Sequence, residues 1–84
     1  MPYISQQDRP KHQDVIDNIY AINSAGELNF VLTLVCKKYM QKKKRNYQTF
    51  NDIIGALEGC KQEFYSRVVA PYEEQKIKEN GDVY

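Results

Sequence analysis

Tryptophan is absent from this 84-residue chain, and metal-binding side chains are few, with two cysteines and one histidine. His12 has no second histidine to pair with, and Cys36 and Cys60 do not match the spacing of common zinc sites. We therefore expect neither a metal nor a cofactor. Each cysteine falls within an apolar helical pattern, which favours free, buried thiols in a reducing compartment over a structural disulfide.

Long apolar runs are also missing. No run approaches the roughly 18 residues that a helix needs to cross a bilayer. The first five residues, MPYIS, have neither the basic start nor the apolar core of a secretory signal. We therefore expect a cytoplasmic protein that does not enter a membrane.

Catalytic motifs are scarce as well. The sequence has no glycine-rich phosphate loop after a strand, and no serine or cysteine in a recognisable nucleophile turn. The carboxylates fall where solvated helix faces would place them. We therefore predict a protein that is not an enzyme. A small enzyme stays open as an alternative if two carboxylates, or His12 and a carboxylate, face each other in a pocket.

What the chain does have is a helical apolar period along most of its length. Apolar residues make up 42% of the sequence, which is enough for a folded domain. The second periodic segment is apolar around much of its circumference, so we expect it to be largely buried. Helices are predicted over residues 9–24, 27–43, 49–70 and 71–79, between an N-terminal arm of residues 1–7 and a C-terminal tail of residues 80–84.

The predicted fold class is therefore all-α, as a single domain. We expect a small bundle of three main helices, with a short fourth helix after Pro71. Thr49 and Asp52 have the spacing of a capping box at the start of the third helix. If it continues past Pro71, the segment 49–79 is one long helix whose roughly 28 helical residues would span about 40 Å if straight, whereas a compact chain of this length has a radius of gyration of only about 12 Å. We therefore expect this helix to bend at Pro71 or to be covered by a second copy, and we predict a homo-oligomer.

Two glycines lie one turn apart on the third helix, where each costs about 0.5–1 kcal/mol relative to alanine. Something must therefore come close to the backbone there. The occupant could be a neighbouring helix of the same chain, a helix of a second copy, or a ligand. Residues at spacings of three and four continue the same small, polar face. This predicted close-approach face consists of Asp52, Gly55, Gly59, Gln62 and Ser66.

Positive charge is concentrated in one segment. Residues 37–48 carry six basic and no acidic side chains, whereas residues 1–36 have a net charge of −2 and residues 49–84 of −3. Cations at the end of a helix favour its dipole, so a solvated helix end is one interpretation. An anion site is the other, because cations attract phosphates and tyrosine rings can stack on bases. The candidate ligand-binding residues are Lys37, Lys38, Tyr39, Lys42, Lys43, Arg45 and Tyr47.

Short motifs at both ends and in the third helix give the chain a resemblance to a family of short uncharacterised proteins of bacteria, archaea and their phages. They are MPYI at residues 1–4, GELNF at 26–30, IGALE at 54–58, EFY at 63–65, VVAPYE at 68–73 and KIKENGDVY at 76–84. Ser66 and Phe30 depart from the family pattern, in which we expect a basic residue and a tyrosine. The resemblance implies no activity.

The function expected from the sequence is that of a small, non-enzymatic, oligomeric binding protein. Its ligand would be a small nucleotide-like anion or a partner protein, and sequestration of a host nucleotide signal by a phage protein is one concrete form. The alternative is an accessory protein that binds nucleic acid through the segment Lys37–Arg45. The acidic flanks of that segment disfavour a long nucleic-acid track.

Overall fold

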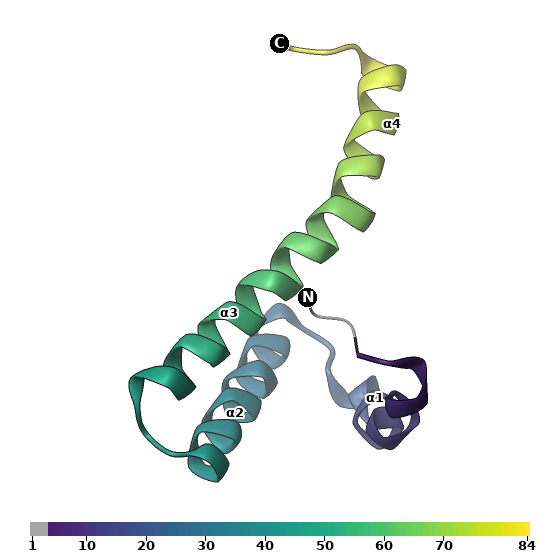
Figure 1. Ribbon diagram of the computed structural model, residues 1–84. Coiled ribbons are helices and arrows are strands. Elements are labelled where there is room, and N and C mark those ends of the chain that lie inside the picture. Colours follow the sequence, from purple (N-terminus) through teal and green to yellow (C-terminus); the bar gives the residue numbers. More distant parts are fainter. Residues whose placement is uncertain (1–3) are drawn as a thin grey trace.

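The computed structural model describes residues 4–84, so the first three residues of the predicted arm lie outside the described part of the chain. Residues 4–84 form helices and no strands, which confirms the all-α class (Figure 1). In chain order the elements are the 3-10 turns η1 (Gln6–Asp8) and η2 (Pro10–His12), α1 (Gln13–Asp17), the 3-10 turn η3 (Ile19–Ala21), α2 (Ala25–Lys43), α3 (Tyr47–Phe64), the π-helical turn η4 (Tyr65–Val69) and α4 (Ala70–Asn80).

The N-terminal segment differs from the single helix expected over residues 9–24. It is a series of short helical turns, of which the longest, α1, has five residues. Asn18 explains why α1 stops. Its side-chain Nδ2 donates to the backbone carbonyl of Asp14 at 2.6 Å, which is the carbonyl that its own N–H would use in a continuing α-helix. The N–H of Asn18 bonds to Val15 O instead, at 3.3 Å.

α2 begins at Ala25 because Ser24 and Glu27 satisfy the free amides at its start. Ser24 Oγ accepts from the backbone N–H of Glu27 at 3.1 Å, and Glu27 Oε1 accepts from the N–H of Asn23 at 3.1 Å. This is a variant of the capping box, in which Glu27 reaches the N–H of the residue before the N-cap instead of that of the N-cap itself. Gly26, which lies between the two predicted helices over residues 9–24 and 27–43, is inside the first turn of α2.

α3 begins two residues before the expected position, because Asn46 caps it. The backbone N–H of Thr49 donates to Asn46 Oδ1 at 2.9 Å. Thr49 is therefore inside the helix, and the capping box expected at Thr49 and Asp52 does not form. Asp52 accepts instead from Gln48 Nε2 at 2.8 Å.

α3, η4 and α4 form one long helix of 34 residues, and its length and bend confirm the prediction for this part of the chain. The π turn lies directly before Pro71, where the N–H of Ala70 bonds to Tyr65 O, five residues back. A proline ring normally crowds the carbonyl four residues earlier and removes one helical hydrogen bond. The wider π turn accommodates Pro71, so the helix bends and continues to Asn80. Gly81, with φ of 85°, then ends it.

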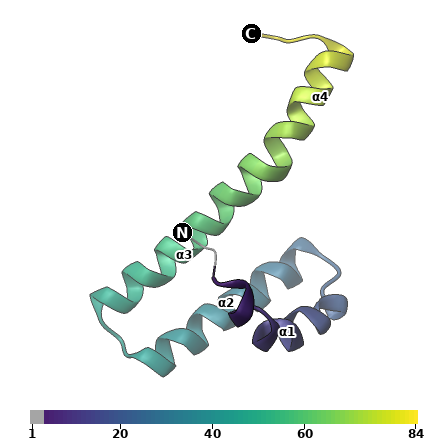
Figure 2. The same ribbon diagram turned by 45° about the vertical axis from the view of Figure 1, so that its right-hand side comes forward.

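Packing between elements is confined to one hairpin among the described residues. α2 and α3 run antiparallel on either side of a three-residue turn, whereas α4 extends beyond the rest of the chain (Figures 1 and 2). No apolar residue of 4–84 is buried, and Thr49 is the single buried residue. The expectation that the second helix is largely buried is therefore wrong for the isolated chain.

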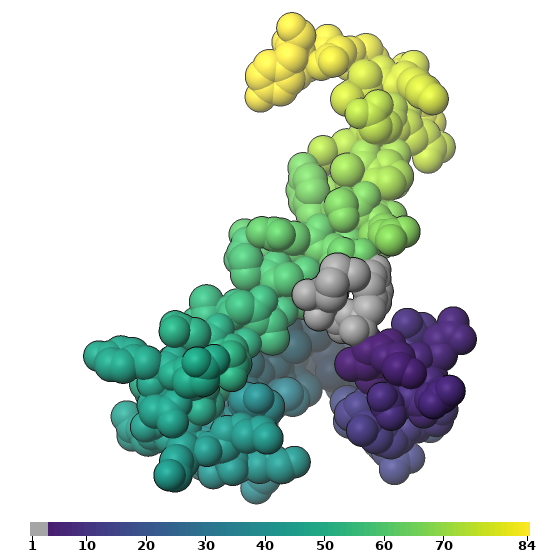
Figure 3. Space-filling view, in the orientation of Figure 1, coloured from purple at the N-terminus to yellow at the C-terminus, as the bar shows by residue number. Residues whose placement is uncertain are grey.

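The shape of the molecule is correspondingly open (Figure 3). Its radius of gyration is 16.6 Å and its longest dimension is 49 Å, whereas about 12 Å is typical of a compact chain of this length. The accessible surface is 7915 Å². A folded monomer of this mass typically exposes about 5,200 Å². The chain thus leaves its apolar faces without a core of their own.

Candidate functional site

The cations predicted as a ligand site lie at one end of the α2–α3 hairpin. We call this surface the basic turn and define it as Lys37, Lys38, Lys42, Lys43, Lys44 and Arg45. Lys42 and Lys43 are in the last turn of α2, and Lys44 and Arg45 are in the loop that follows. The ion pairs of residues 4–84 join Lys61 to Glu58, Arg67 to Glu63 and Lys76 to Glu79. No carboxylate of the described residues therefore neutralises the basic turn.

Lys37 and Lys38 stand one to two turns back from the loop. With Gln41 they border a shallow depression whose floor is formed by Val31, Leu34 and Val35. Lys38 and Lys42 are four residues apart on α2, so they share one helix face. A flat apolar floor beside two cations is suited to a ligand that has both a ring and a negative charge.

The two predicted tyrosines occupy different surroundings. Tyr47 is 84% exposed, and its ring meets Phe50 edge-on with 6.4 Å between centroids. Tyr39 lines the groove between α2 and α3, and Lys43 Nζ lies 6.0 Å from its ring centroid. Tyr47 can therefore stack on a ligand without rearrangement, whereas Tyr39 holds one cation of the basic turn over its ring.

Lys44 has an unusual backbone conformation. Its φ of 131° and ψ of 151° lie in a region that is essentially restricted to glycine. Its N–H still donates to Met40 O at 2.9 Å, which closes the last turn of α2. The sequence thus places a lysine, and an additional positive charge, where a glycine would fit the backbone better.

Among residues 4–84, nothing covers the two glycines of the predicted close-approach face. A Cβ atom added at Gly55 or Gly59 would meet no atom within 4 Å. Contact with another helix of the same chain therefore does not account for these glycines. The two glycines lie on the side of α3 opposite Ile53 and Leu57, which line the grooves with α2, whereas Asp52 of the same face lines one of these grooves.

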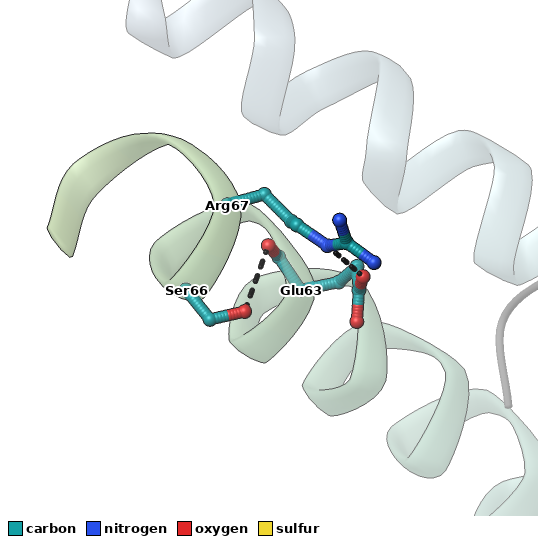
Figure 4. A network of polar contacts seen from close by, with 3 residues as sticks. All are labelled: Glu63, Ser66 and Arg67. Carbon is teal, nitrogen blue, oxygen red and sulfur yellow. Dashed lines mark hydrogen bonds and ion pairs between the residues drawn. The ribbon is translucent and has the colours of Figure 1, made fainter. Parts of the chain in front are cut away.

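The polar side chains of this face bond along their own helix. Gln62 Nε2 donates to Glu58 Oε1 at 3.4 Å. Ser66 Oγ donates to the backbone carbonyl of Glu63 at 3.3 Å, and the neighbouring Arg67 Nε is 3.1 Å from Glu63 Oε1 (Figure 4). These contacts span three or four residues, so they stabilise the helix along its own length.

An apolar groove along the α2–α3 hairpin was not recognised from the sequence as a surface. The groove is lined by residues that the helical apolar period assigns to a protein core. A buried core has the same period, so the sequence alone did not identify the groove as an exposed surface. Cys36 is half-buried in it and Cys60 is exposed at its end, and both thiols are free. The expectation of buried thiols is therefore wrong for Cys60. The groove consists of two adjoining depressions along α2 and α3. The residues that line both depressions are Leu32, Cys36, Ile53 and Leu57.

A tyrosine–carboxylate contact connects the π turn to α4. Tyr65 Oη donates to Glu73 Oε2 at 3.2 Å. Residues eight apart on an ideal α-helix are about 80° apart around the axis, and the extra residue of a π turn reduces this to about 20°. The hydrogen bond to Glu73, followed by the charge of Glu73 and by burial, raises the pKa of Tyr65 above its usual value.

Within residues 4–84 no three histidine, cysteine or carboxylate side chains are grouped as metal ligands. Among the same residues, none of the helices has both the length and the apolar character needed to cross a bilayer.

The fold and the basic turn together define a small all-α protein with a cationic hairpin and uncovered apolar faces. The chain belongs to the family described as a domain of unknown function, DUF6899, whose model matches residues 1–83. This confirms the resemblance to a family of short uncharacterised proteins, which brings no activity with it. No curated protein and no solved structure matches the chain significantly.

Proposed function

We propose that this chain is a small, non-enzymatic binding protein of the cytoplasm whose copies associate and whose basic turn holds a small anionic ligand. A nucleotide fits this surface, because its phosphates would meet the lysines and its base could stack on Tyr47. Sequestration of a nucleotide signal, as by a phage protein, is one form of this function. The observation that carries the proposal is a cluster of six cations without a carboxylate partner in the described chain.

Helix stabilisation explains only part of this cluster. Cations in the last turn gain about 0.3–1 kcal/mol from the helix dipole, and the effect falls off beyond that turn. Lys42 and Lys43 are in the last turn, but Lys37 and Lys38 are not. Lys44 occupies a strained backbone position that favours glycine. A ligand gives all these charges a common role, which the dipole does not.

The test uses the purified protein and a panel of mononucleotides and cyclic dinucleotides. We expect at least one to raise the melting temperature and to bind in calorimetry. The triple variant Lys42→Gln, Lys43→Gln, Lys44→Gln should bind at least about tenfold more weakly, because one lost charge-assisted hydrogen bond is worth about 1.5–3 kcal/mol. The control variant Arg9→Gln, Lys11→Gln, Lys61→Gln has the same change in net charge and should bind normally. A panel without any thermal shift, or equal losses in both variants, refutes the proposal.

Nucleic-acid binding is the second candidate, and the exposed ring of Tyr47 beside the basic turn favours a single strand over a duplex. Fluorescence anisotropy with a single-stranded 20-mer at low salt measures it. Binding should weaken as salt rises, and the lysine-to-glutamine triple variant should flatten the slope of log K against log salt. Undetectable binding at low salt, or a slope that the substitutions leave unchanged, rules this candidate out.

A further inference from the structure

We infer that two copies of this chain form an antiparallel dimer in which the C-terminal arm of each copy packs on the α2–α3 hairpin of the other. We define the arm as residues 65–80, which comprise η4 and α4. The inference rests on the self-association included in the proposed function, and it specifies the surfaces and the direction of that association.

The exposed area calls for a large interface. The chain exposes 7915 Å², about 2,700 Å² more than a compact monomer of its mass. An interface of standard size takes only about 800 Å² from each partner, and obligate dimers take about 1,000–2,500 Å². The excess therefore corresponds to an extensive, obligate interface along most of the long helix.

The arm and the hairpin groove each have an apolar face that residues 4–84 leave exposed. On the arm, Val68 is 51% exposed and Tyr72 is 58% exposed. In the groove, Leu32 is 45% exposed. The arm continues the axis of α3 away from α2, so it is unable to fold back onto its own hairpin without breaking the long helix (Figures 1 and 3). Only another molecule can bring an arm to this groove.

Charge selects the antiparallel direction. Residues 37–48 carry six positive charges at the hairpin end of the molecule. A parallel dimer would place two such clusters side by side. An antiparallel dimer separates them by about the length of the long helix, far beyond the screening length of about 8 Å at physiological salt. It also brings residues 70–84, which are most of α4 and the tail after it and have a net charge of −2, close to the basic turn of the second copy, whose six positive charges leave an excess for the ligand.

The register follows from symmetry. A two-fold axis through the middle of the helix Tyr47–Asn80 passes near Phe64. Each residue then lies opposite the one equally far on the other side of Phe64, so Cys60 faces Val68 of the second copy. Cys60 is exposed and free. Within one chain the Cα atoms of these two residues are about 12 Å apart along the helix, too far for a disulfide, which needs about 7 Å or less.

The experiment therefore combines Cys36→Ser, which leaves Cys60 as the native thiol, with Val68→Cys. We expect light scattering to give twice 9.9 kDa, and mild oxidation to give a covalent dimer that reductant reverses. The matched control, Cys36→Ser with Glu74→Cys, has its new thiol further along the arm and should remain non-covalent. A monomer with normal helix content, or a dimer that cross-links equally through both positions, overturns the arrangement.

These outcomes are separate from the ligand test. A monomer that still binds a nucleotide through the basic turn removes the dimer and leaves the proposed ligand. A cross-linked dimer that binds no nucleotide does the reverse.

Discussion

Replacing the strained Lys44 by glycine should stabilise the protein. A non-glycine residue in this region of φ and ψ costs about 1–3 kcal/mol, and Lys44 has φ of 131° and ψ of 151°. Glycine removes that strain but adds about 0.5–1 kcal/mol of conformational entropy to the unfolded chain. The net effect is a gain of up to about 2.5 kcal/mol, and of about 1 kcal/mol at the middle of these ranges. For a chain of this size each kcal/mol raises the melting temperature by about 4–8 °C.

The assay is urea and thermal unfolding followed by circular dichroism at 222 nm. All variants are compared at one protein concentration, because association makes the melting temperature depend on concentration. Lys44→Gln is the control, since it removes the same charge from the basic turn but keeps the side chain that causes the strain. The difference between Lys44→Gly and Lys44→Gln therefore isolates the backbone term. A Lys44→Gly variant no more stable than Lys44→Gln would show that the backbone at this residue is not strained.

Two further predictions concern single hydrogen bonds. Ser24→Ala should lower the free energy of unfolding by about 1 kcal/mol, because the N–H of Glu27 loses its acceptor, and Ser24→Thr should restore most of it; an unchanged urea midpoint contradicts this. The pKa of Tyr65 is raised by Glu73. The stability from this pair is therefore fully present below about pH 10 and is lost as pH rises through the raised pKa. The Tyr65 titration, obtained at 295 nm as the difference from Tyr65→Phe, should move to lower pH in Glu73→Gln; an unmoved curve refutes the assignment.

Features of the fold that depend on a single local pattern could be predicted from the sequence. The apolar period indicated α2 and the long helix, and Pro71 marked the region of the bend. The predicted helix boundaries were wrong where a side chain competes with the helix for the same backbone group. The side chain of Asn18 donates to the backbone carbonyl of Asp14, which a continuing α1 would use for its own hydrogen bond. Asn46 caps α3 ahead of Thr49, and the Ser24–Glu27 capping box keeps Gly26 helical.

The residues of the candidate site could be predicted from the sequence, but what surrounds them in space could not. The run of lysines identified the basic turn directly, because sequence neighbours at a helix end remain neighbours in space. Whether apolar residues are buried depends on what packs against them. The helical spacing that includes Leu32 and Leu57 is the same whether these residues lie in a core or in an interface. The open environment of Gly55 and Gly59 likewise required coordinates, since one sequence pattern fits contact within a chain and contact between chains.

The π turn also determines how the chain would respond to a change in length. Each residue of an α-helix turns the chain by about 100°, and the wider π turn over Tyr65–Val69 absorbs one extra residue. Loss of a single codon from this stretch would restore α-helical geometry and leave the side chains of α4 pointing almost as they do now. Tyr65 and the present Glu73 would then be seven residues apart and still about 20° apart around the axis. Any surface that uses both halves of the long helix should therefore tolerate a one-residue deletion in η4 better than substitutions that turn η4 into regular α-helix at full length.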